Sequence, residues 1–156
     1  MRPGRRIGVD VGTVRVGVAV SDRDGLLATP VTTLARDAAG AADQAQVAEL
    51  AREHEAVELV VGLPRSLSGR EGPAAQAARA YAQALAALVA PLPVRLVDER
   101  LTTVSAQQHL RRAGVRERQG RGVVDQVAAV VILQHALDAE RSSGRVPGEL
   151  VPPTSG

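Results

Sequence analysis

The chain has 156 residues, of which 45% are hydrophobic, and a formal net charge of +2; this length and composition suit one domain with a core of ordinary size. The absence of cysteine excludes a disulfide scaffold, a thiol nucleophile and a thiolate zinc site, and one aromatic residue is too few for the stacking platforms of single-strand-binding proteins. Because no apolar run reaches the ~18 residues of a membrane span and the N-terminal run is too short for a signal peptide, we expect a cytoplasmic protein without membrane contact.

The first third of the chain has the pattern of three antiparallel strands. Residues 7–11 are mostly apolar, and residues 16–20 alternate valine with glycine and alanine. The link at 12–14 is short enough for a hairpin, and a turn signal at 22–25 precedes a third strand at 29–34. We therefore expect an antiparallel meander.

The rest of the chain alternates strand and helix patterns. Apolar runs predict strands at 57–61 and 94–97. Helical periodicity, helix starts and helix stops predict helices at about 40–54, 73–90, 102–112 and 121–141. Residues 142–156 hold three prolines and three glycines without periodicity, so we expect a disordered tail after a single domain over 1–141.

This order of elements predicts an α/β fold. Hairpins followed by right-handed crossovers give a mixed five-stranded sheet, most economically in the order 3-2-1-4-5, with helices on both faces. That layout is ribonuclease-H-like.

Three carboxylates stand at the edges of apolar elements: Asp10 within the first strand, Glu99 after the last strand and Asp125 at the start of the last helix. A buried carboxylate is costly without a cation, and hard oxygen ligands suit Mg²⁺ or Mn²⁺ in phosphodiester cleavage. Asp98 competes with Glu99 as a ligand. A ligand from the last strand must reach Asp10 across the fourth strand, a total of roughly 9.5 Å over two strand spacings. Glu99 is favoured because glutamate has the longer side chain. Plainer roles remain open, a turn residue for Asp10 and a helix-dipole partner for Asp125.

All 19 basic residues are arginines, and several lie close together near the end of the chain. Arg111, Arg112, Arg116 and Arg118 predict a basic patch for nucleic-acid phosphates, although a solvated surface loop explains them equally well. Arg100 either contacts a substrate phosphate or pairs with Asp98 and holds that side chain in place.

Several motifs resemble, in order and spacing, those of the YqgF (RuvX) family: residues 8–13, 17–22, 60–64, 98–103, 125–129 and 132–134. The resemblance implies a ribonuclease-H-like fold similar to the RuvC Holliday-junction resolvases. It also implies a metal-dependent nuclease that matures the 5′ end of pre-16S ribosomal RNA, with Asp10, Glu99 and Asp125 as catalytic and metal-binding residues. The implied partner is structured RNA.

One position departs from the family pattern. The family often has lysine after Gly-Thr, where this chain has Val14 and then Arg15. Arg15 is expected to supply the missing charge, although a guanidinium fork differs from a point charge. Arg65 lies in the glycine-rich loop 65–72, which matches the family's loop in position only. Arg65 is also expected to contact a substrate phosphate.

Parts of the sequence also suit three other functions. Residues 10–13 also resemble the first phosphate loop of actin-like and sugar-kinase ATPases, but the chain has neither a second domain nor a second such loop. A Holliday-junction resolvase acting on branched DNA would need a homodimer, whereas an RNA nuclease could act as a monomer. A non-catalytic ribosome-assembly factor could keep the same fold.

Overall fold

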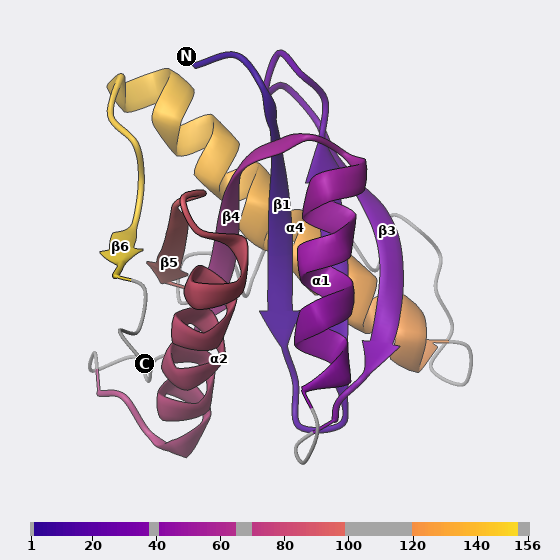
Figure 1. The fold of residues 1–156 in the computed structure, drawn as a ribbon. Helices are drawn as coiled ribbons and strands as arrows, with labels where there is room; N and C mark the ends of the chain where they lie inside the picture. The colour runs from indigo at the N-terminus through magenta and orange to yellow at the C-terminus, as the bar shows by residue number, and fades with distance from the viewer. Residues whose placement is uncertain (1, 38–40, 65–69, 99–119, 153–156) are drawn as a thin grey trace.

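The computed structural model describes residues 2–37, 41–64, 70–98 and 120–152, and in the last helix it describes side chains from residue 127 onward. These residues form a mixed six-stranded sheet with helices against both faces (Figure 1). The strands are β1 (Arg5–Val11), β2 (Arg15–Ser21), β3 (Ala28–Ala35), β4 (Ala56–Leu63), β5 (Val94–Asp98) and β6 (Glu149–Val151). The helices are α1 (Ala42–Glu53), α2 (Pro73–Val89) and α4 (Gly120–Ser143).

The strand order is β3-β2-β1-β4-β5-β6. β1 pairs antiparallel with β2, and β2 with β3, whereas β1–β4 and β4–β5 are parallel. The predicted ribonuclease-H-like order 3-2-1-4-5 is confirmed, with β6 added beyond β5. The helix expected at 102–112 lies outside the described residues.

The two faces of the sheet bury separate cores. α1 and α2 cover one face and α4 crosses the other (Figure 1). Strand alternation divides neighbouring residues between them: Leu96 packs into the core under α1 and α2, and Val97 into the core under α4. β4 is buried on both faces, as its continuous apolar sequence predicted.

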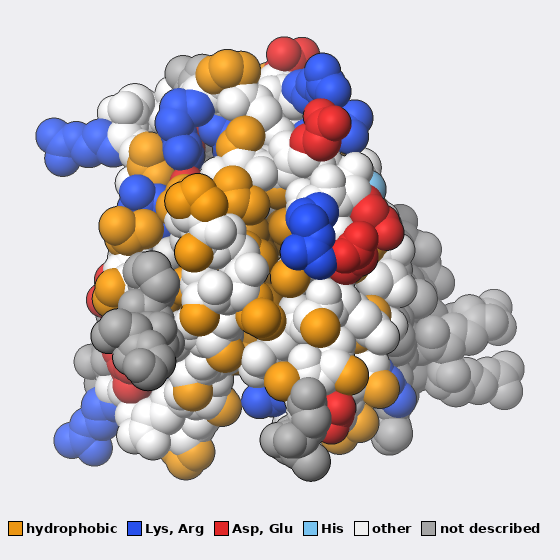
Figure 2. Space-filling model, in the orientation of Figure 1, with side chains coloured by type: hydrophobic (Ala, Val, Ile, Leu, Met, Phe, Trp, Pro, Cys, Tyr) orange, Lys and Arg blue, Asp and Glu red, His pale blue; other side chains and the backbone are white. Residues whose placement is uncertain are grey.

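The surface over α2 carries few charges (Figure 2). Alanine dominates this helix, and Arg79 is its single charged residue. α2 begins at Pro73, which suits the first helical turn because proline lacks an amide hydrogen to donate. Its buried side includes Tyr81, which is only 2% exposed.

The expectation of a disordered tail over 142–156 is wrong for its central part. α4 extends to Ser143, and β6 pairs antiparallel with β5. Val151 is 5% exposed and packs beside Val94, so a single apolar anchor holds this short strand in the core. A three-residue strand between prolines has no detectable periodicity, which is why the sequence pattern did not predict it.

Candidate functional site

Asp10 lies near the carboxyl end of β1, in the middle of the sheet. It pairs with Gly17 of β2, so the neighbouring residue in that direction has no side chain. Asp10 is partly exposed, whereas Val9 before it is fully buried. A carboxylate in this position is held by strands on both sides and still meets solvent.

The face on which Asp10 lies is defined by Gly8. A Cβ atom at Gly8 would come within 2.7 Å of the Leu133 Cβ and 3.0 Å of the Ala129 carbonyl oxygen. α4 therefore packs directly on the backbone of β1. Because strand residues alternate, Asp10 shares this face with Gly8, while Val9 belongs to the core under α1 and α2.

Asp125 occupies the register position on α4 that precedes Ala129 by four residues. Ala129 in turn precedes Leu133 by four, and both contact the Gly8 position. Residues four apart lie on one stripe of a helix, so Asp125 continues the stripe that packs on β1. Its side chain is outside the described part, and its approach to Asp10 stays a prediction.

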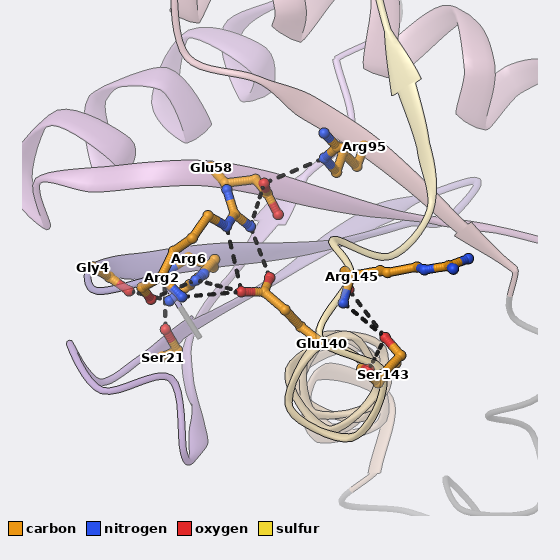
Figure 3. Close-up of polar contacts among 10 residues, drawn as sticks. Arg2, Gly4, Arg6, Ser21, Glu58, Arg95, Glu140, Ser143 and Arg145 are labelled. Carbon is orange, nitrogen blue, oxygen red and sulfur yellow. Dashed lines mark hydrogen bonds and ion pairs between the residues drawn. The ribbon is translucent and has the colours of Figure 1, made fainter.

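A buried ion-pair network fixes the other end of α4 (Figure 3). Glu140 of α4 accepts from the guanidinium groups of Arg2 at 2.8 Å and Arg6 of β1 at 3.3 Å. Glu58 of β4 pairs with Arg2 at 2.9 Å and with Arg95 of β5 at 3.4 Å. The network thus joins α4 to the amino-terminal ends of the central strands.

Electrostatics favour the ionised form of Glu140. Burial alone would raise the pKa of this carboxyl, but hydrogen bonds from Arg2 and the charges of Arg2 and Arg6 outweigh it, and the pKa is lowered. Sequence analysis did not identify this network. Its one visible signal was Glu58 inside an otherwise apolar strand.

The carboxyl ends of β1, β4 and β5 meet at one edge of the sheet, because these three strands are parallel. Ligand sites gather at such edges. Gly62 of β4 pairs with Val97, and Leu63 with Asp98. Asp98 follows Leu96 by two residues, so alternation assigns it to the side of α1 and α2, opposite to Asp10.

Several predicted residues lie outside the described part of the chain: Glu99, Arg65, Arg100, Arg111, Arg112, Arg116 and Arg118. Arg15 is described and begins β2, directly after the turn that follows Asp10. That turn is closed by a hydrogen bond from the Gly12 amide to the Arg15 carbonyl, at 2.9 Å.

The donor chemistry at this edge suits a hard divalent cation. Asp10 offers carboxylate oxygens, and its cross-strand partner Gly17 places no side chain beside them. Among the described side chains, no three His, Cys, Asp or Glu residues are grouped to hold a metal ion. Two of the three predicted ligands fall outside that set.

No helix in the described residues is long and apolar enough to cross a membrane.

Comparison with known proteins agrees with this fold. The family model described as "RuvX: Holliday junction resolvase" matches residues 4–139. A Streptomyces avermitilis protein named "Putative pre-16S rRNA nuclease" is 57% identical over 150 residues, covering 96% of this chain and 95% of that protein. A Nocardioides protein with the same name is 58% identical over 159 residues, covering 99% of this chain and 100% of that protein.

Solved structures with a similar fold include "T. thermophilus RuvC in complex with Holliday junction substrate". The TM-score is 0.58 at 15% identity, over 94% of this chain and 99% of that one. A second Thermus thermophilus RuvC structure has a TM-score of 0.53 at 15% identity, over 89% of this chain and 97% of that one. At this identity the likeness concerns the fold alone.

Proposed function

The chain belongs to the RuvX family, and from this premise we propose that it is a metal-dependent nuclease that hydrolyses phosphodiester bonds. The observation that carries the proposal is the position of Asp10. Its carboxylate stands at the edge where three parallel strands end, on the face that α4 covers through its contact with Gly8.

The proposed substrate is the 5′ end of precursor 16S rRNA. Relatives that are 57% and 58% identical over nearly the whole chain carry that name. The RuvC structure with a junction substrate is only 15% identical. Close sequence identity over the full length supports transfer of a substrate better than fold likeness does. Such a substrate implies a cytoplasmic protein.

The proposed site uses Asp10 as the central ligand of Mg²⁺ or Mn²⁺, with Glu99 and Asp125 completing the set. When bound, the metal would supply activation of water and stabilisation of the leaving oxygen. The strands on either side of β1 fix the Asp10 backbone, and the Gly8–Leu133 contact fixes the distance of α4 from it.

Arginines are proposed to hold the substrate by its phosphates. They are Arg15 beside the site and Arg65, Arg100, Arg111, Arg112, Arg116 and Arg118 in the segments outside the described residues. With one aromatic residue in the chain, base stacking contributes little, so binding should weaken steeply as salt rises.

The test is product analysis with Mg²⁺ or Mn²⁺ on precursor rRNA and on a four-way DNA junction. Asp10→Asn should abolish cleavage and leave metal-free binding intact, because the arginines remain. Asp138→Asn, an exposed change on α4, is the matched control and should cleave normally. Intact substrates with the wild-type protein would refute the nuclease.

A second candidate function follows from the name of the matching family, which is that of a Holliday junction resolvase. Cleavage of the four-way junction in preference to precursor rRNA would establish it. A resolvase needs two sites related by symmetry, so the protein should then have the mass of a homodimer in solution. A monomer that cleaves precursor rRNA would exclude it.

A further inference from the structure

The turn that follows Asp10 is held from outside by one residue, Arg36. Arg36 comes directly after the last residue of β3. Its guanidinium Nη1 donates to the Gly12 carbonyl at 2.7 Å, and its backbone amide donates to the Val14 carbonyl at 2.8 Å. One residue therefore binds both ends of the turn.

The guanidinium of Arg36 is itself fixed by two buried side chains. Its Nε lies 3.8 Å from the Asp43 carboxylate of α1, and its central carbon lies 5.2 Å from the ring centroid of Tyr81 of α2. The Tyr81 hydroxyl donates to Asp43 at 3.0 Å. Asp43 and Tyr81 are each 2% exposed.

These contacts restrain the Arg36 guanidinium. A buried carboxylate needs a cation and donors to offset its desolvation, and Asp43 has Arg36 and the Tyr81 hydroxyl. Burial and the hydrogen bond to Asp43 raise the pKa of Tyr81, so its hydroxyl remains a donor. The chain's only aromatic residue thus also faces the cation with its ring.

We propose that Arg36 is a positioning residue of the nuclease site, which holds the 12–14 turn and thereby orients Asp10. The inference rests on the proposed function, because that proposal gives Asp10 its role. Gly12 is two residues from Asp10, so a displaced Gly12 carbonyl moves the end of β1. Displacements near 1 Å can cost about 100-fold in rate.

The closing experiment compares Arg36→Met with Arg52→Met. Arg52 pairs with Glu49 on the exposed side of α1, so this control removes the same charge away from the turn. Hydrogen exchange of the Gly12 amide should accelerate roughly tenfold or more in Arg36→Met, the effect of losing one charge-assisted hydrogen bond. The control should match the wild type.

Two functional readouts separate positioning from substrate contact. Arg36→Met should lower kcat about tenfold or more and weaken Mn²⁺ binding measured by calorimetry, while metal-free RNA binding equals that of the control. Lower metal-free binding than in the control would make Arg36 a direct phosphate contact and overturn the proposal. Unchanged Gly12 exchange in Arg36→Met would also overturn the proposal. Faster exchange with unchanged kcat and Mn²⁺ affinity would overturn it as well.

Two milder variants keep the test decisive if Arg36→Met does not fold. Tyr81→Phe removes only the hydroxyl that donates to Asp43, and Arg36→Lys keeps the charge without the fork. Both should accelerate Gly12 exchange relative to the wild type, and unchanged exchange in both would overturn the proposal. Wild-type protein that cleaves nothing would refute the nuclease, while Gly12 exchange would still decide whether Arg36 holds the turn.

Discussion

Gly8 of β1 and Leu133 of α4 are in direct contact across the interface between sheet and helix. A Cβ atom at Gly8 would lie 2.7 Å from the Leu133 Cβ and 3.0 Å from the Ala129 carbonyl oxygen, so no side chain fits without a shift of the helix. α4 carries Asp125 one turn further toward its amino terminus. The distance between β1 and the backbone of α4 therefore depends on a glycine.

Gly8→Ala should push α4 away from β1. We expect a loss of unfolding free energy of about 1–3 kcal/mol from overpacking, and weaker Mn²⁺ binding in the protein that remains folded. Urea unfolding and calorimetry measure the two effects. Gly72→Ala is the control, because nothing lies within 4 Å of a Cβ there. Equal stability of both variants would contradict the close contact.

Glu140→Gln should destabilise the protein most at neutral pH. The variant removes the carboxylate that pairs with both Arg2 and Arg6, at a cost of about 3 kcal/mol, the lower end for buried pairs because Arg2 is partly exposed and still pairs with Glu58. The pKa of Glu140 is lowered in the folded state. Its stabilisation is therefore complete above the unfolded value of ~4.3 and disappears as pH falls through the folded pKa.

The measurement is urea unfolding of wild type and Glu140→Gln at neutral pH and at successively lower pH. The difference in unfolding free energy between them should shrink as the solution becomes more acidic. Glu53→Gln, on the exposed side of α1, should differ little from the wild type at every pH. A difference that stays constant for Glu140→Gln would show that ionisation of this carboxyl does not stabilise the fold.

β6 offers a matched pair of substitutions. Val151 is 5% exposed and Leu150 is 54% exposed, although they are adjacent. Val151→Ala should cost about 1–3 kcal/mol of unfolding free energy through a cavity beside Val94, whereas Leu150→Ala should change it by less than about 0.5 kcal/mol. Thermal unfolding of the two variants compares them directly. Similar values would mean that β6 is not anchored in the core.

The fold was predictable because its signals are local. Valine alternation in β2 and continuous apolar residues in β4 each indicated a strand, and hairpins followed by crossovers left few possible strand orders. β6 was not predicted because a strand with one buried valine is too short to show an alternating pattern of apolar residues. The Arg36–Asp43–Tyr81 contacts were missed for another reason. They join the residue after β3 to α1 and α2, and no spacing rule relates these three elements.

The choice between Asp98 and Glu99 is the sharpest prediction of the site. Asp98 falls on the face under α1 and α2, whereas Asp10 shares the opposite face with Gly8. Glu99→Gln should therefore abolish Mn²⁺-dependent cleavage and weaken Mn²⁺ binding by at least about 100-fold. Loss of a residue that only supports a metal ligand costs up to about 100-fold, so loss of a direct ligand should cost at least as much. Asp98→Asn should retain Mn²⁺ affinity within a few-fold. The reverse pattern, with Asp98→Asn inactive and Glu99→Gln unaffected, would assign the metal to Asp98 and require β5 to twist its last residue toward α4.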